Sequence, residues 1–365
     1  MSPGEPRAAG AGFAGRLAAC VAARESQIVL GLDPDPARLW PAAIADRSSG
    51  RHERAASERP AGSRGDRGHG SAVERPDGSP TDRPDGSAVE RSDGSSADRP
   101  DGSPAERAAA AVAEHCRLLI DAAGAACVAV KPQVACFERL GAPGWAALGE
   151  VAEHARAAGL LVLADAKRGD IDVTAAAYAQ GLLTGLDTPW GRIDGLRADA
   201  VTVNPYLGRD ALDPFASAAR AAGAGLFVLV RTSNPGAVDV EDVETAEDGA
   251  LWEHVARLVA RLGRDLDADR PLSSVGAVMG ATAPEHLARA RELMPRTPFL
   301  LPGIGAQGGR VEDLAPAFAP GPAGGLITAS RSIARAHEAS GGDPAAAAAA
   351  EAERLRAAAW ALHTA

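Results

Sequence analysis

Short apolar runs recur along the chain, and each ends at or just before a glycine, a proline or a polar side chain. The runs are rich in Val, Leu, Ile and Ala, a composition typical of strands buried on both faces of a parallel sheet. Eight of them are predicted as strands, at residues 27–33, 125–131, 160–167, 199–204, 225–231, 274–279, 298–302 and 325–328.

The segments between these runs have the spacing of helices. In residues 8–24, for example, Phe13, Leu17 and Val21 recur every four positions. Strands that alternate with helices over about 300 ordered residues predict one α/β domain spanning residues 1–365, a (β/α)8 TIM barrel. A doubly wound open sheet is the alternative, weakened because no GxGxxG motif follows the first strand. Further helices are predicted at residues 108–123, 142–158, 172–184, 210–222, 248–264, 283–293 and 343–362.

Residues 47–106 interrupt this pattern after the first strand. They have almost no large apolar side chains, and from Glu74 the motif Arg-Pro-Asp-Gly-Ser, or a close variant of it, recurs every eight residues. Such a short polar repeat cannot bury enough surface to offset the entropy of ordering the chain. We therefore expect a disordered, low-complexity insertion within the barrel domain, which loop-closure entropy tolerates at little cost.

Composition narrows the possible partners and compartment. A net charge of −10 argues against nucleic acid or an anionic membrane as the main partner. The four cysteines form no CxxC pair, so we expect reduced core residues of a cytoplasmic protein and no metal site. No run approaches membrane-spanning length, and the start of the chain lacks the apolar segment of a signal peptide.

Charged and polar residues gather where the predicted strands end. In a barrel these ends share one rim, where active sites lie. Asp165 and Lys167 are two apart and should point to the same side of an extended chain. Each charge alone could belong to a structural ion pair, but five of eight strands bringing charge to one rim favours a substrate site. These strand ends carry Asp33, Lys131, Asp165, Lys167, Asp170, Asn204, residues 231–233 and Arg331.

The loop at residues 303–309 is rich in glycine, and Arg331 follows the last strand. Glycines allow backbone N–H groups to face an anion, and an arginine adds a bidentate cation. A phosphate site after strands seven and eight is a recurrent feature of barrels. The pattern therefore predicts phosphate binding here rather than a glycine loop without function.

Six stretches together resemble the orotidine 5′-phosphate decarboxylase family, in its bacterial branch with longer loops. The resemblance runs from about Phe13 to Ala336 apart from the insertion, and it implies a (β/α)8 barrel. The DxKxxD core at 165–170 is shared with related sugar-phosphate enzymes, whereas the complete set in this order is highly specific. The stretches are residues 31–34 (GLDP), 130–133 (VKPQ), 165–170 (DAKRGD), 202–206 (TVNPY), 231–236 (RTSNPG) and 302–309 (PGIGAQGG).

The resemblance implies the decarboxylation of orotidine 5′-phosphate to uridine 5′-phosphate and CO2, the last step of de novo pyrimidine nucleotide synthesis. It implies no cofactor and no metal. The catalytic network would be Lys131, Asp165, Lys167 and Asp170, with Lys167 as the cation and proton donor at C6 of the ring. Such enzymes are homodimers with shared active sites, in which Asp170, Ile171 and Thr174 enter the partner's site.

The resemblance also implies the contacts to the rest of the substrate. Asp33 would bind the ribose, Ser233 the pyrimidine ring and Arg331 the phosphate, and Gln307 lies on the loop that closes over the ligand. Ser330 departs from the glycine expected before that arginine. The acidic stretch 238–248 has no implied role.

Two other functions remain open from the sequence. A metal-dependent sugar-phosphate decarboxylase or aldolase of the same superfamily would keep DxKxxD, although Ser233 in its setting favours a pyrimidine. A non-catalytic nucleotide-binding barrel is the second, and the intact lysines and aspartates argue against it.

Overall fold

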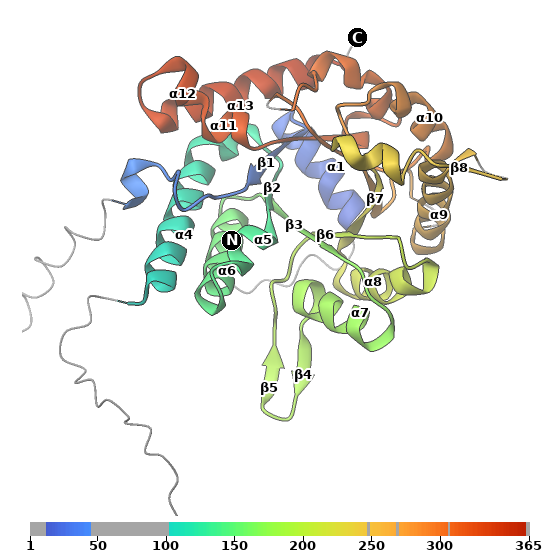
Figure 1. The fold of residues 1–365 in the computed structure, drawn as a ribbon, viewed down its shortest axis with the longest axis horizontal. Coiled ribbons are helices and arrows are strands. Elements are labelled where there is room, and N and C mark those ends of the chain that lie inside the picture. The colour runs from blue at the N-terminus through green and yellow to red at the C-terminus, as the bar shows by residue number, and fades with distance from the viewer. Residues whose placement is uncertain (1–11, 45–101, 247–248, 268–269, 306, 363–365) are drawn as a thin grey trace, which may run out of the picture.

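The computed structural model describes residues 12–44, 102–246, 249–267, 270–305 and 307–362. Eight parallel strands close into a barrel in the order β1-β12-β11-β10-β7-β6-β3-β2 (Figure 1). All eight predicted strands are confirmed, with some ends shifted, and the open-sheet alternative is wrong. The strands are β1 (Ile28–Leu32), β2 (Ala129–Pro132), β3 (Leu161–Arg168), β6 (Ala200–Val203), β7 (Gly225–Arg231), β10 (Val275–Met279), β11 (Phe299–Pro302) and β12 (Gly325–Ala329).

Helices cover the outside of the barrel (Figure 1). They are α1 (Phe13–Arg24), α4 (Pro104–Ala123), α5 (Val134–Glu138), α6 (Ala142–Ala157), α7 (Asp172–Ala179), α8 (Arg209–Ala222), α9 (Leu251–Leu266), α10 (Glu285–Leu293), α11 (Arg331–Ala334), α12 (Ala336–Ser340) and α13 (Pro344–Ala361). A π-helical turn, Gln180–Thr184, extends α7. Within the described residues, none of these helices is long and apolar enough to cross a membrane.

The predicted end of the insertion, residue 106, is wrong. Helix α4 begins at Pro104 because Ser103 forms a capping box with Glu106: each side chain bonds the other residue's backbone N–H. Such a cap satisfies two N–H groups that would otherwise have no partner. Residues 47–101 of the expected disordered insertion, and with them all of the octapeptide repeat except Gly102 and Ser103, lie outside the described residues.

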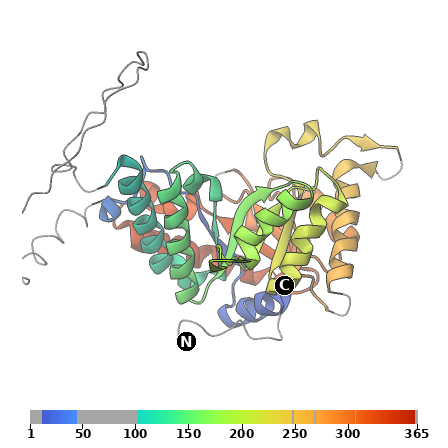
Figure 2. The same cartoon turned by 90° about the horizontal axis from the view of Figure 1, so that it is seen from below.

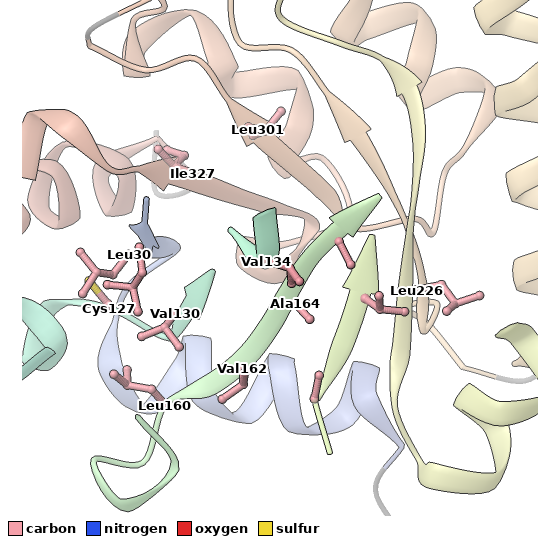
Figure 3. Close-up of a cluster of buried hydrophobic side chains, with 14 of the residues drawn as sticks. Leu30, Cys127, Val130, Val134, Leu160, Val162, Ala164, Leu226, Leu301 and Ile327 are labelled. Atoms are coloured by element: carbon pink, nitrogen blue, oxygen red, sulfur yellow. The ribbon is translucent and has the colours of Figure 1, made fainter. Parts of the chain in front are cut away.

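Alternating strand positions separate two apolar layers. Odd-numbered residues of β3, Leu161 and Leu163, face the barrel interior, while Val162 faces the helices. Figure 3 shows this outer layer, in which Val162 lies near Val130 of the neighbouring strand. The same alternation directs Asp165, the next odd position, into the barrel.

Helix α1 closes the amino-terminal end of the barrel, at the bottom of Figure 2. Its predicted apolar face is confirmed, because Phe13, Leu17 and Val21 are fully buried against the interior layer. The Phe13 ring meets Phe227 edge-on, with centroids 5.9 Å apart. A Cβ on Gly225 would lie 2.3 Å from the Phe13 ring, so only glycine fits there. With this end plugged, ligand access is left to the opposite rim.

Two small hairpins were not expected from the sequence pattern. Strands β4 (Leu186–Thr188) and β5 (Gly191–Ile193) form an arm that projects from the barrel (Figure 1). Strands β8 (Glu244–Thr245) and β9 (Gly249–Ala250) pair just before α9. Each strand has only two or three residues, too few for a period-two pattern to be recognised.

Candidate active site

A cavity of about 830 Å³ opens at the carboxyl ends of the barrel strands. Volumes of this order are typical of small-molecule sites. Seven of the ten predicted site residues line it, brought together from six different strand ends: Asp33, Lys131, Asp165, Lys167, Ser233, Gln307 and Arg331.

The centre of the site is one carboxylate shared by two lysines. Lys131 Nζ donates to Asp165 Oδ2 and Lys167 Nζ donates to Asp165 Oδ1, each over 2.5 Å. The Thr202 hydroxyl donates to the same Oδ1 over 3.0 Å and accepts the backbone N–H of Lys167 at 2.9 Å. Thr202 is therefore a fourth member of the array. It belongs to residues 202–206, one of the six stretches that carry the family resemblance, but no role was predicted for it.

Burial and charge act in opposite directions on this array. Burial disfavours the ionised form of Asp165, but the two lysines outweigh it and lower its pKa to about 2. Burial also disfavours the charged form of Lys131, yet Asp165 and Asp33 raise its pKa above the ordinary value. Asp165 is consequently an anion at neutral pH, and Lys131 is a buried cation held by it.

The two lysines differ in access to the cavity. The Lys131 side chain is 7% exposed, whereas that of Lys167 is 43% exposed. Lys167 can therefore approach a ligand while it keeps its bond to Asp165. Lys131 mainly supports the carboxylate between them.

The predicted strand through Asp165 and Lys167 is confirmed, but its backbone is irregular at that point. The register of β3 on β6 shifts between Ala164 and Arg168, and Lys167 has φ +47° in the left-handed region. Non-glycine residues adopt that conformation at a cost, often at functional sites. The bulge, rather than simple alternation, brings Lys167 Nζ back to Asp165, and the Thr202 hydroxyl holds the displaced backbone.

Three predicted residues do not line the cavity: Asp170, Ile171 and Thr174. The Asp170 carboxylate accepts the N–H of Ile171 over 2.8 Å. Ile171 is 52% exposed at the start of α7, and the neighbouring Val173 is 82% exposed. Within one chain, therefore, the Lys–Asp–Lys part of the predicted network is assembled, and Asp170 stands apart from it.

At the other end of the cavity lie Gln307 and Arg331. Gly303, Gly305 and Gly308 of the intervening loop all have positive φ, which explains the glycines. The N–H groups of Gly305, Gly308 and Gly309 donate to carbonyls of the same loop. In this structure they are therefore not available to an anion as the sequence suggested, and Arg331 is the cation at this end.

Ser330, the departure from the expected glycine, is accommodated by a glycine elsewhere. A Cβ on Gly31 would lie 2.6 Å from the Cβ of Ser330. The bare backbone of β1 thus makes the space that a side chain at position 330 needs, so Ser330 does not displace Arg331 from the cavity.

The described part of the acidic stretch, residues 238–246, lies beside the end of β7. Asp242 accepts two bonds from the Arg231 guanidinium, of 2.7 and 2.9 Å. The Glu241 carboxylate accepts the N–H and the hydroxyl of Thr232. Nothing in the sequence marked these two acids, because their partners, Arg231 at the end of β7 and Thr232 just after it, are nine to eleven residues away along the chain.

In the described part of the chain, no three His, Cys, Asp or Glu side chains are arranged to hold a metal ion. The four cysteines are all free. Burial raises the pKa of the Cys127 thiol to about 12, so that thiol is a core residue rather than a nucleophile.

Known proteins resemble this chain in sequence and in fold. A family model described as "Orotidine 5′-phosphate decarboxylase / HUMPS family" matches residues 98–350. The orotidine 5′-phosphate decarboxylase of Rhodopirellula baltica is 45% identical over 234 residues, which cover 63% of this chain and 75% of that one. The enzyme of the same name from Deinococcus radiodurans is 47% identical over 216 residues, covering 59% and 74%. The solved structure of Leishmania donovani OMP decarboxylase has a TM-score of 0.54 and 36% identity, covering 69% of this chain and 89% of that chain.

Proposed function

The chain belongs to the orotidine 5′-phosphate decarboxylase / HUMPS family, and from this membership we propose that it converts orotidine 5′-phosphate to uridine 5′-phosphate and CO2. The observation that carries the proposal is the Lys131–Asp165–Lys167 array, which exposes one cation to a cavity large enough for a nucleotide. This reaction would complete de novo synthesis of pyrimidine nucleotides.

Lys167 is assigned the central chemical role. When CO2 leaves, the electron pair of the broken bond stays on C6 of the pyrimidine, with no adjacent carbonyl to delocalise it. A fixed ammonium group stabilises that charge and then transfers a proton to C6, combining electrostatic stabilisation with general acid catalysis. The exposed Nζ of Lys167 suits both tasks, and its bond to Asp165 orients it before substrate arrives.

Asp165 is assigned a place beside the substrate carboxylate. At about 4 Å, two negative charges repel by roughly 4 kcal/mol at an effective dielectric constant of about 20. This repulsion disappears as CO2 departs, so it lowers the barrier relative to the bound substrate. A pKa of about 2 keeps Asp165 ionised for this purpose. Lys131 compensates its charge when the cavity is empty.

The remaining cavity residues are assigned to binding. Arg331 and Gln307 hold the phosphate, Ser233 bonds the pyrimidine and Asp33 bonds the ribose, consistent with their separate positions around one cavity. Binding energy from the phosphate, far from C6, contributes to closing the site and excluding water. We propose that the reaction needs no metal and no organic cofactor.

We further propose a homodimer in which Asp170, Ile171 and Thr174 complete the partner's site. The support is that these residues lie outside their own cavity, next to exposed apolar side chains. Ile171 and Val173 are joined by Tyr206, which is 81% exposed after the neighbouring strand β6. Exposed apolar residues of this size commonly mark a protein interface. Size measurement in solution tests this part independently.

The decisive experiment follows the absorbance of orotidine 5′-phosphate after addition of the purified protein in EDTA. We expect uridine 5′-phosphate to form at an undiminished rate. Turnover that EDTA abolishes and a divalent cation restores would favour the metal-dependent sugar-phosphate alternative. Absence of any turnover would leave only a nucleotide-binding barrel.

The free cysteines accord with a cytoplasmic location, which is likewise a proposal.

A further inference from the structure

The stretch after β7 folds back onto the strand end from which it starts. Glu241 Oε2 accepts the backbone N–H of Thr232 over 2.8 Å, and Glu241 Oε1 lies 2.9 Å from the Thr232 hydroxyl, whose single proton it shares with Asn234 Oδ1 at 2.6 Å. Both carboxylate oxygens are thus committed to the residue that precedes Ser233. Two charge-assisted bonds to one residue fix its orientation as well as its position.

The other side of Ser233 is held by the loop after β10. The Thr282 hydroxyl donates to the Ser233 carbonyl over 3.1 Å. A Cβ on Gly280 would lie 2.8 Å from the Ser233 Cα, so these two backbones are in close contact. Ser233 is consequently held from both sides, by Glu241 through Thr232 and by the 280–282 backbone.

A second acid in the stretch anchors Glu241 itself. The adjacent Asp242 binds the Arg231 guanidinium through both oxygens, and Arg231 is a buried residue of β7. The carboxylate of Glu241 is therefore placed by an ion pair to the barrel wall, not by a free loop. Glu241 lines the same cavity as Ser233, and its hydrogen bonds to Thr232 connect it to Ser233 through the backbone.

We propose that Glu241 is a positioning residue that aligns Ser233 and thereby sets the selectivity of the cavity for a pyrimidine base. The inference rests on the proposed function, since the contact between Ser233 and the ring is part of it. A hydrogen bond that distinguishes ligands depends on sub-ångström placement, and a site whose donor is displaced loses discrimination before it loses general binding. Loss of Glu241 should therefore weaken the binding of the pyrimidine base. Binding of the phosphate, which Arg331 holds, should not change.

The test measures affinity of the intact chain for two ligands by calorimetry, namely uridine 5′-phosphate and ribose 5-phosphate, which lacks the base. In Glu241→Ala we expect affinity for uridine 5′-phosphate to fall about tenfold, equivalent to about 1.4 kcal/mol. Affinity for ribose 5-phosphate should stay within about twofold. Glu241→Asp, whose shorter side chain keeps the charge but not the reach, should behave in the same way and is less disruptive to folding.

Two further variants separate geometry from charge. Glu241→Gln should retain most of the affinity, because its amide oxygen can accept the Thr232 N–H and its NH2 can donate to the Thr232 hydroxyl. Glu244→Ala removes an exposed acid of the same stretch that lines no part of the cavity, and it should match the unmodified chain for both ligands.

The possible results distinguish failure of the positioning role of Glu241 from failure of the proposed function. Equal loss of both ligands in Glu241→Asp, or unchanged affinity for uridine 5′-phosphate, overturns the positioning role. If the unmodified chain binds uridine 5′-phosphate but does not decarboxylate orotidine 5′-phosphate, the proposed reaction fails while the affinities still decide the inference. A chain that binds neither ligand overturns both.

Discussion

Two charged clusters on the barrel rim, at strand ends separated by β6, have opposite compositions. At the end of β3, one carboxylate, Asp165, lies between two lysines. At the end of β7, one guanidinium, Arg231, lies beside two carboxylates, with Asp242 bonded to it and the nearest Glu241 oxygen 3.8 Å away. The first cluster leaves a half-exposed ammonium group in the cavity, and the second commits its charges to backbone and to one another. Under the proposed function, similar residue types therefore serve chemistry at the end of β3 and hold the backbone at the end of β7.

The difference follows from where each cluster places its surplus charge. The β3 cluster has an excess of positive charge facing the cavity, where a substrate carboxylate can compensate it. The β7 cluster has an excess of negative charge, but the Glu241 carboxylate is occupied by hydrogen bonds from the N–H and hydroxyl of Thr232. The half-exposed ammonium group of Lys167 at the cavity is the feature on which our proposal separates the β3 cluster from the β7 cluster.

The largest expected effect is on Lys167. Lys167→Ala should lower kcat by about 10⁴-fold, because it removes both the cation and the proton donor at C6. Affinity for uridine 5′-phosphate should change by less than about tenfold, since the phosphate and ring contacts remain. Steady-state kinetics with orotidine 5′-phosphate and calorimetry with the product measure the two quantities. Near-normal turnover in Lys167→Ala would mean that the β3 cluster, like the β7 cluster, is not catalytic.

Asp165→Asn should be strongly destabilising as well as inactive. Lys131 would keep its burial but lose its carboxylate partner, and breaking such a pair costs about 3–5 kcal/mol. Urea denaturation measures this loss in the free energy of unfolding. As a comparison, Lys167→Ala should cost much less, because its side chain is half-exposed and its removal still leaves Asp165 paired with Lys131.

Asp242→Asn should cost about 2 kcal/mol of stability, because Arg231 loses a bidentate charge partner but keeps its bond to the Thr232 carbonyl. The cost is smaller than at Asp165 since the Asp242 side chain is 29% exposed. The kcat for orotidine 5′-phosphate should fall only a few-fold, far less than in Lys167→Ala. A loss of kcat as large as that of Lys167→Ala would show that the β7 cluster takes part in the chemistry.

The smallest expected effect is a pH dependence of the unfolding free energy that comes from Asp165. The pKa of Asp165 is lowered from 3.8 to about 2, so its ionisation stabilises the fold above pH 4 and this contribution is lost as pH falls from about 4 to 2. The shift corresponds to about 2 kcal/mol. The difference in unfolding free energy between the unmodified chain and Asp165→Asn should therefore shrink over that interval. A constant difference down to pH 2 would mean that Asp165 is not held ionised by the lysines.

Much of the fold was predictable because its signals are local. Continuous apolar runs indicated all eight barrel strands, and the four-residue spacing of Phe13, Leu17 and Val21 indicated α1. Charges at strand ends indicated which residues would share a rim, and seven of the predicted ones line a single cavity. The two short hairpins and the first turn of α4 were missed, since two-residue strands have no period and a capping box can lie within polar sequence.

The sequence by itself thus determined which segments become the eight strands and which charged residues share the rim, and it favoured a barrel over an open sheet. Periodicity and the rule that parallel strands end together do not depend on distant contacts. Only the tertiary structure decided which hydrogen bonds and ion pairs the rim residues form. The bulge that returns Lys167 to Asp165 and the Thr202 hydroxyl that holds it arise from contacts between β3 and β6, and the reach of Glu241 to Thr232 arises from a contact within an irregular segment. Such contacts are selected by packing and by the need to pair every buried charge, and neither is written in the spacing of residues along the chain.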